Sequence, residues 1–371
     1  MTTRKLVTVC QILSISPIKN ADTIELIYIK GWQVVVKKGL HKVGEYVIFC
    51  EIDSWIPTEL APFLSKGNEP REYNGVKGEK LRTIRLKGQL SQGLVMPLFE
   101  KTINKKLCNY YGYGWSEQTV KEVCEKQEDL SEILGIQKWE APIPFQLSGI
   151  MKGNFPSFLR KTDQERIQNI WEDYKDKYNN IEFEVSLKLD GTSFTCYYYN
   201  EKFGVCSRNM ELKEGENTYW KVAKEAKLEE SLKKLGVNLA IQGEIIGEGI
   251  QGNPEKINGH LLKVFDVYDI DTAQYLPSHK RFQVLHKLNE DGKLFGICPI
   301  MEDQKHYSDK LKVSFKLSQF ETLDDLLKFA DGSSERAEIR EGLVFKSLEH
   351  IDGQIISFKV ISNMFLEKQK N

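Results

Sequence analysis

Alternating apolar and polar positions in the first hundred residues predict a series of short β-strands. Turn-forming glycine, asparagine and aspartate residues separate the segments. The expected strands are 5–15, 23–29, 33–37, 46–51, 81–86 and 93–97. Short strands at such close spacing are typical of a small closed barrel. We therefore expect a β-barrel domain over residues 1–100.

The pattern changes after residue 100. Residues 104–135 are more polar and show helical spacing, which predicts a helical connector over 101–135. Strand and helix patterns then mix over residues 136–371. The expected strands are 182–188, 193–199, 202–207, 239–246, 262–270, 342–347 and 354–360, and the expected helices are 217–235, 277–288 and 322–329. This mixture predicts an α+β fold class with a mostly antiparallel sheet.

Composition narrows the possible partners and compartments. The chain has 52 basic and 53 acidic residues, so contact with nucleic acid would need a local basic patch. The 7 cysteines form no Cys-x-x-Cys pair and the 6 histidines are scattered, which argues against a zinc site and a disulfide framework. Neither a signal peptide nor a membrane-spanning apolar run is recognisable. We expect a soluble monomer in a cytoplasmic or other intracellular compartment, with no membrane contact.

The first candidate for chemistry is the sequence Lys188-Leu189-Asp190-Gly191. It follows the apolar segment 183–187, so Lys188 and Asp190 would face one side of a strand, and Gly191 would let the chain turn. A partly buried lysine beside a bound metal can lose its proton and act as a nucleophile. Taken alone, the same pattern also fits an ordinary strand that ends in a turn.

Further motifs follow this lysine. In chain order they are Ser-Arg-Asn at 207–209, Gln-Gly-Glu at 242–244, Val-Phe-Asp-Val-Tyr-Asp at 264–269, Glu-Gly-Leu-Val-Phe-Lys at 341–346 and Ser-Phe-Lys-Val at 357–360. Each motif alone fits a solvated strand edge. As an ordered set, they resemble the motif series of the covalent nucleotidyltransferases, which include the polynucleotide ligases and the mRNA-capping enzymes. The resemblance covers residues 144–360.

The resemblance implies a covalent mechanism that uses ATP. Lys188 would attack the α-phosphorus of the nucleotide, and Lys346 and Lys359 would stabilise charge on the α-phosphate. The implied carboxylate ligands of Mg²⁺ or Mn²⁺ are Asp190, Glu244 and Glu341. A hydrated cation beside a lysine also favours its neutral form.

The same resemblance implies contacts to the rest of the nucleotide. An aromatic side chain would stack on the base, and this is Phe265 or Tyr268, because the motif can be aligned in two ways. Arg208 would contact ribose and phosphate, and Glu244 would serve both ribose and metal. In many relatives the last motif is Lys-x-Lys, whereas this chain has Ser357 at the first position.

Domain order selects among the branches of this superfamily. DNA ligases and capping enzymes usually carry an OB-fold barrel after the catalytic domain, whereas only 361–371 follow the last motif here. A barrel that precedes the catalytic domain resembles the ATP-dependent RNA ligases of the Naegleria type. Residues 155–169 are also similar to RNA ligases, in which Arg166 would match an arginine that contacts the outer phosphates. The alternative is a capped helix start with Arg166 in solvent.

The expected architecture is therefore an N-terminal OB-like β-barrel followed by an antiparallel-sheet nucleotidyltransferase domain. Basic residues of the barrel would follow an RNA backbone. They are Lys37, Lys38, Lys42, Lys77, Lys80, Arg82, Arg85 and Lys87. The sequence G-x-G-x-x-G at 247–252 matches a dinucleotide-binding fingerprint, but no βαβ pattern surrounds it and we reject that assignment.

These observations predict an ATP-dependent RNA ligase. It would join RNA 3′-hydroxyl and 5′-phosphate ends, in a nicked duplex or as paired ends, through a lysyl-AMP and an adenylylated RNA 5′ end. A capping-type guanylyltransferase or a DNA ligase is the alternative enzyme. A nucleic-acid-binding protein that has lost catalysis is the alternative of a different class.

Overall fold

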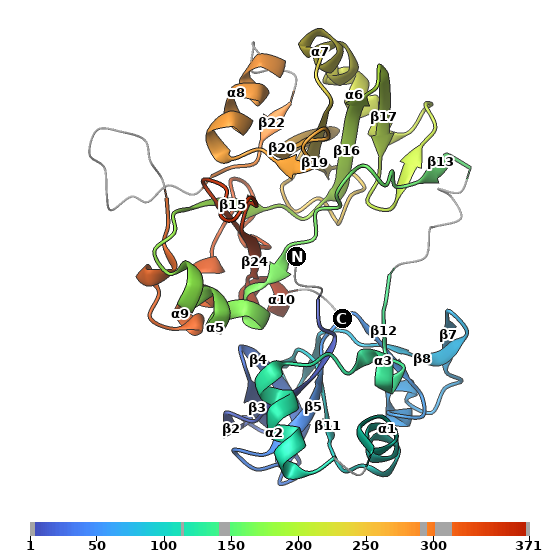
Figure 1. Ribbon diagram of the computed structural model, residues 1–371, viewed down its shortest axis with the longest axis vertical. Helices are drawn as coiled ribbons and strands as arrows, with labels where there is room; N and C mark the ends of the chain where they lie inside the picture. Colours follow the sequence, from blue (N-terminus) through green and yellow to red (C-terminus); the bar gives the residue numbers. More distant parts are fainter. Residues whose placement is uncertain (1–3, 113–114, 141–148, 290–294, 301–313, 369–371) are drawn as a thin grey trace. The chain divides into compact units, whose positions relative to one another are not determined.

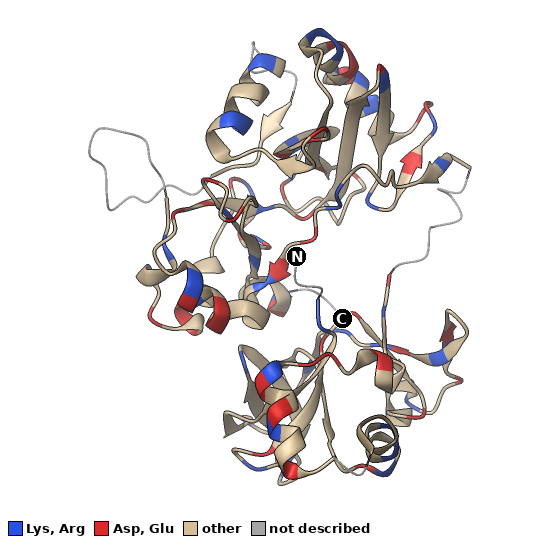
Figure 2. Cartoon of the chain, viewed as in Figure 1, with Lys and Arg blue, Asp and Glu red and all other residues tan. Residues whose placement is uncertain are grey.

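The computed structural model describes residues 4–112, 115–140, 149–289, 295–300 and 314–368. The chain divides into two compact units, Met1–Pro142 and Ile143–Lys368. Figure 1 shows both units and the labels used below. Acidic and basic residues are interspersed over each unit (Figure 2), and over the whole sequence their charges nearly cancel.

The N-terminal unit is built mainly from short strands. They are β1 (Val7–Gln11), β2 (Ser14–Pro17), β3 (Ile24–Ile29), β4 (Trp32–Lys37), β5 (Tyr46–Cys50), β6 (Ser54–Pro57), β7 (Arg71–Tyr73), β8 (Val76–Lys80), β9 (Ile84–Leu86), β10 (Gln89–Ser91), β11 (Leu94–Pro97) and β12 (Gln137–Lys138). Strands β1, β5 and β11 pair antiparallel, and β2, β3 and β4 form a meander. Inward-facing side chains such as Ile27, Trp32 and Phe49 are fully buried between them.

The helices of this unit pack on the strands. They are α1 (Lys101–Tyr111), α2 (Glu117–Lys126), α3 (Ser131–Leu134) and the 3-10 turn η1 (Pro62–Ser65). Ser116 caps α2 by accepting a hydrogen bond from the backbone N–H of Thr119. Ile103 of α1 and Val120 of α2 lie in the same core as Val7 of β1. The segment expected as a connector therefore contributes to the core of the barrel unit.

The C-terminal unit contains longer strands. They are β13 (Met151–Asn154), β14 (Glu165–Arg166), β15 (Phe183–Lys188), β16 (Thr192–Tyr199), β17 (Lys202–Cys206), β18 (Met210–Leu212), β19 (Leu239–Gly247), β20 (His260–Asp269), β21 (Gln274–Tyr275), β22 (Gly296–Ile297), β23 (Gly342–Ser347) and β24 (Ser357–Ile361). Its helices are α5 (Ile167–Tyr178), α6 (Thr218–Glu225), α7 (Leu228–Leu235), α8 (Ser278–Leu288), α9 (Leu323–Ala330) and α10 (Asn363–Lys368), with the 3-10 turn η3 (Leu317–Gln319).

The described strands of this unit form a large and a small sheet. The large sheet has the order β13-β18-β17-β16-β19-β20-β21, with β22 beside β20, and the small sheet has the order β14-β24-β23-β15. All pairings are antiparallel except β14 with β24 and β20 with β22. Helices α6 and α7 cover one face of the large sheet, and α5 and α9 pack on the small sheet (Figure 1). The predicted α+β fold class is confirmed.

One expected helix is interrupted. The pattern predicts a helix over 217–235, and Asn217 caps its start as expected, by accepting a hydrogen bond from Trp220 N–H. The helix ends at Glu225, and Lys227 adopts a left-handed conformation with φ 47° before α7 begins. The break allows Trp220 of α6 and Leu232 of α7 to enter one core. Among the described helices, none is both long enough and apolar enough to cross a membrane.

Candidate active site

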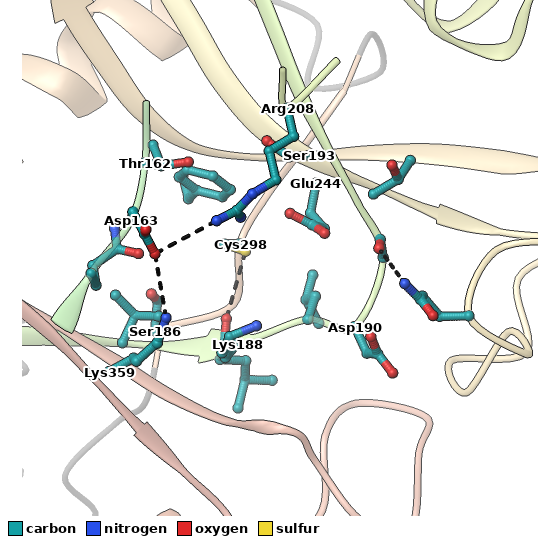
Figure 3. Close-up of a pocket in the computed structure, with 18 of the residues that line it drawn as sticks. Thr162, Asp163, Ser186, Lys188, Asp190, Ser193, Arg208, Glu244, Cys298 and Lys359 are labelled. Carbon is teal, nitrogen blue, oxygen red and sulfur yellow. Dashed lines mark hydrogen bonds and ion pairs between the residues drawn. The ribbon is translucent and has the colours of Figure 1, made fainter. Parts of the chain in front are cut away.

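A cavity of about 380 Å³ lies between the two sheets of the C-terminal unit. The small sheet contributes Lys188, Lys346 and Lys359, and the large sheet contributes Glu244 and Phe265. Figure 3 shows Lys188, Glu244 and Arg208 directed into this space. Motifs that are up to 171 residues apart, from Lys188 to Lys359, therefore line one cavity.

Lys188 is the last residue of β15 and is held by an ion pair. Its Nζ donates a hydrogen bond to Oε2 of Glu341 over 2.7 Å. The lysine side chain is 28% exposed and that of Glu341 is 16% exposed, so the cavity gives the amine access to a small ligand. Glu341 precedes β23, the neighbour of β15, and strand pairing places Gly342 opposite Lys188.

The chain crosses from the small sheet to the large sheet immediately after Lys188. Gly191 was expected to permit a turn, but its backbone is not in the left-handed region that requires glycine. A Cβ atom there would lie 2.4 Å from the Ile245 carbonyl oxygen and 2.7 Å from Cγ of Glu244. Glycine is therefore needed for the close approach of this crossing to β19, which sets the spacing between Lys188 and Glu244.

Two carboxyl groups in the cavity have raised pKa values. Burial raises the pKa of Glu244 to about 7; Lys188 opposes this shift, and the charges of Glu341 and Asp190 add to it. Burial and the charge of Glu341 raise the pKa of Asp190 to about 6, again opposed by Lys188. The carboxylates of Asp190, Glu244 and Glu341 thus lie near enough to repel one another. Such mutual repulsion is relieved by a cation.

The three carboxylates do not form a closed metal cage. Among the residues that the structure describes, no three acidic, histidine or cysteine side chains are close enough to hold an ion by themselves. Mg²⁺ commonly keeps several waters and is bound by one or two carboxylates together with substrate phosphates. The arrangement fits that open mode of binding.

A carboxylate bridges two of the predicted phosphate-binding cations. Oδ1 of Asp163 lies 3.6 Å from Arg208 and 3.7 Å from Nζ of Lys359 (Figure 3). Two cations that converge on one carboxylate can also converge on a phosphate oxygen. Asp163 entered the sequence analysis only as part of a similar segment, because an aspartate near a helix start usually indicates a cap.

Lys346 lines the cavity, but its ammonium already forms an ion pair and a hydrogen bond with neighbouring residues. Its Nζ is 2.8 Å from Oδ2 of Asp266 and donates to the Phe265 carbonyl oxygen over 2.9 Å. Arg281 of α8 pairs with Glu184 over 2.5 Å and lies 4.0 Å from Asp266. All four charged side chains are at most 7% exposed. Lys346 therefore anchors the strand that carries Phe265.

The structure distinguishes the two candidate aromatic residues. Phe265 lines the cavity, whereas Tyr268 is buried with Tyr197 and Ala240 in a separate core. An irregular register between β19 and β20 pairs Gly243 with Val264 but Gln242 with Asp266, which leaves Phe265 as the extra residue. This bulge directs Phe265 into the cavity, and the sequence pattern alone could not reveal it.

Most predicted site residues line the cavity, and two lie behind it. Arg166 pairs with Lys359 across β14 and β24 but is not a lining residue, and Glu341 reaches the cavity through Lys188. Lining residues that the sequence analysis did not assign include Gln251 and Cys298. Gln251 donates a hydrogen bond to the Gly191 carbonyl oxygen over 3.4 Å. It lies in the rejected G-x-G-x-x-G segment, which forms a turn between β19 and β20.

Comparisons with known proteins agree with this geometry. An RNA ligase family model matches residues 181–361, and an OB-fold domain model matches residues 6–98. An apo mutant structure of Naegleria gruberi RNA ligase is 41% identical, covers 99% of both chains and has a TM-score of 0.78. Structures of the same ligase with PPi, and of a mutant with ATP and Mn, are also 41% identical with TM-scores of 0.77. Both matches cover 99% of this chain. They cover 99% of the chain in the PPi complex and 100% of the chain in the ATP and Mn complex. No significant match to a curated protein was found.

A two-sheet catalytic unit with a lysine between the sheets, matched by an RNA ligase model, places the chain among the covalent nucleotidyltransferases. Within that class, the chain belongs to the RNA ligase family. The expected resemblance to ATP-dependent RNA ligases of the Naegleria type is confirmed, as is the assignment as an enzyme.

We predict that Gly191→Ala destabilises the protein. The added methyl would press on the Ile245 carbonyl group, and overpacking of this kind costs about 1–3 kcal/mol. Urea unfolding measures the change. Gly215→Ala is the matched control, since it lies in the same unit and a Cβ there meets nothing within 4 Å. Equal stability of the two variants would show that β19 can move away.

Glu244→Gln should stabilise the protein at high pH. Because the folded-state pKa of about 7 lies above the ordinary value of 4.5, the unfolded chain ionises Glu244 first. The free energy of unfolding therefore falls as the pH rises from about 4.5 to about 7 and stays low above that. Glutamine removes that loss of stability, so we expect a gain of about 1–3 kcal/mol at pH 8 and little gain at pH 5. Urea unfolding at both pH values tests this. The exposed Glu230→Gln should show no such pH dependence, and a gain for Glu244→Gln that is equal at both pH values would contradict the prediction.

Proposed function

We propose that this protein is an ATP-dependent RNA ligase that joins RNA 3′-hydroxyl and 5′-phosphate ends through a covalent lysyl-AMP. The observation that carries the proposal is the cavity between the sheets, where the amine of Lys188 lies with cations, carboxylates and the half-buried ring of Phe265. Structures of Naegleria gruberi RNA ligase with ATP and Mn, with AMP and Mn, and with PPi support the choice of nucleotide.

In the first step, Nζ of Lys188 attacks the α-phosphorus of ATP. A P–N bond forms as the bond to the β-phosphate oxygen breaks, and pyrophosphate leaves. The ammonium must first lose a proton, and Glu341 at 2.7 Å is placed to accept it. Arg208 and Lys359 exchange Asp163 for the α-phosphate and stabilise the charge that develops on its oxygens. Phe265 stacks on the adenine.

Two further transfers complete the reaction. An oxygen of the RNA 5′-phosphate attacks the AMP phosphorus, the P–N bond breaks and Lys188 recovers its proton. The product is RNA with a 5′-5′ pyrophosphate link to AMP. The 3′-hydroxyl oxygen of the other RNA end then attacks the RNA phosphorus, loses its proton to solvent and displaces AMP.

A divalent ion, Mg²⁺ or Mn²⁺, supplies charge neutralisation at the phosphates when it is bound. Asp190 and Glu244 would hold it through water or directly, and Glu341 would complete the acidic side of the site. Arg166, which neighbours Lys359 across the strand pair, is assigned to the outer phosphates. Lys346 is assigned to the α-phosphate together with Lys359, and its bond to the Phe265 carbonyl oxygen also positions Phe265.

The proposed partner is RNA, as a nicked duplex or as paired ends. We propose boundaries of 1–100 for the OB-fold barrel, 101–135 for its helical segment and 136–371 for the catalytic domain. We also propose that the protein acts as a monomer. Use of ATP and RNA supports an intracellular location.

Transfer of label from ATP to the protein tests the nucleophile. With ATP labelled at the α-phosphate and Mn²⁺, wild type should become labelled, and Lys188→Ala should lose the label completely because no other group replaces the amine. A denaturing gel reads the covalent product, and the exposed Lys202→Ala on β17 is the control. Label from GTP alone would indicate a capping-type enzyme. An unlabelled wild type whose mass excludes bound AMP would contradict the proposal.

Replacing the RNA strand by DNA tests the substrate class. Two nicked duplexes are compared that differ only in an RNA or a DNA strand at the 3′-hydroxyl side. We expect the RNA strand to be sealed at least about tenfold faster, because the 2′-hydroxyl is what distinguishes the two strands. Sealing rates measured with pre-adenylylated enzyme exclude effects on the first step. Equal or faster DNA joining would assign the chain to DNA repair.

A further inference from the structure

The N-terminal unit contains a larger cavity than the one around Lys188. Its volume is about 780 Å³, compared with about 380 Å³. It lies between β4, the turn η1, the hairpin β9–β10 and β11, and we call it the barrel groove. All of its lining residues belong to the barrel unit, so the site is complete within that unit.

Large apolar side chains line the barrel groove and remain exposed. Phe63 is 63% exposed, Leu40 53%, Ile84 41% and Leu86 38%. Folded proteins seldom gather such side chains around an open cavity unless a ligand covers them. Phe63 offers an aromatic face on which a flat ring can stack.

The charged side chains of the groove that have no ion-pair partner among the described residues are cationic. Lys37, Lys66 and Arg82 line it, are exposed and have no acidic partner in the part of the chain that the structure describes. The lining carboxylates are already engaged, since Glu69 pairs with Lys77 and Glu79 pairs with Arg71. A ligand of this groove therefore combines an apolar flat part with negative charge.

Two buried polar side chains add hydrogen-bonding capacity. His41 and Ser65 line the groove and are only 5% and 7% exposed. Nε2 of His41 and Oγ of Ser65 have no hydrogen-bond partner among the described residues. Both atoms are buried donors or acceptors that the described protein groups do not satisfy.

We propose that the barrel groove binds one unpaired nucleotide of the RNA, with its base on Phe63 and its phosphates on Lys37, Lys66 and Arg82. Bases within a duplex are stacked on their neighbours and cannot enter, so the groove selects RNA with an unpaired nucleotide. This inference rests on the proposed RNA ligase function and makes it more specific. The barrel then recognises a single-stranded segment beside the ends, in addition to any contact with duplex backbone.

Binding of two labelled RNAs to the full-length protein tests the proposal. One probe is a single-stranded oligouridine without a 5′-phosphate, and the other is a blunt RNA duplex of equal length. Phe63→Ala should weaken single-strand binding about 5- to 100-fold in fluorescence anisotropy and leave duplex binding unchanged. Phe99→Ala is the matched control, because Phe99 lies in the same unit, is 61% exposed and is outside the groove. It should change neither affinity.

The salt dependence of binding measures the contribution of Lys37 and Lys66 to the groove. The double variant Lys37→Ala, Lys66→Ala should reduce the slope of log K against log salt for the single strand by about 1.4. Single-strand affinity that is unchanged in Phe63→Ala overturns the proposal and leaves the groove to a protein partner. An equal loss for single strand and duplex also overturns it, because the groove would then contact only backbone.

Label transfer from ATP separates this inference from the function on which it rests. Phe63→Ala should become labelled as wild type does, because Lys188 lies in the other unit. Normal labelling combined with unchanged RNA binding would reject the groove alone. A wild type that is never labelled would reject the ligase mechanism.

Discussion

A buried network of four charges is the interaction on which the catalytic unit depends. Glu184 and Lys346 come from the small sheet, Asp266 from the large sheet and Arg281 from α8. Charges removed from water are tolerated only when they are paired, and loss of one partner leaves another uncompensated. The network therefore fixes the two sheets to each other, and the Lys346 bond to the Phe265 carbonyl group extends this rigidity to the cavity wall.

The close approach of Gly191 to β19 is a second constraint on the catalytic unit. The chain passes from one sheet to the other within the residues that separate β15 from β16. Because no side chain separates Gly191 from β19, Lys188 and Glu244 meet in one small cavity. Burial in this cavity raises the pKa of Glu244, and the charges of Glu341 and Asp190 add to the shift, so the site carries electrostatic strain that a bound cation relieves. Catalytic sites commonly store such strain.

Sequence reasoning identified most of the chemistry but not its support. Lys188, Asp190, Glu244 and Lys359 were assigned from motif order, and all line the cavity. Asp163 was not assigned, because a single aspartate near a helix start has a common local explanation. The helix over 217–235 was expected to be continuous, since its apolar residues keep helical spacing from Asn217 to the stop at Gly236. Its break depends on how two apolar faces reach one core, which local propensity does not encode.

The sequence by itself determined the family, the order of the domains and the residue types that line the cavity, because motif order and strand periodicity are local properties of the chain. Tertiary structure alone decided that Phe265 rather than Tyr268 faces the cavity, because a bulge shifts the register of β20. It also decided that the ammonium of Lys346 is neutralised by Asp266, and that exposed apolar and cationic residues of the barrel share a groove. These outcomes depend on which distant segments pack together, and no single stretch of sequence contains that information.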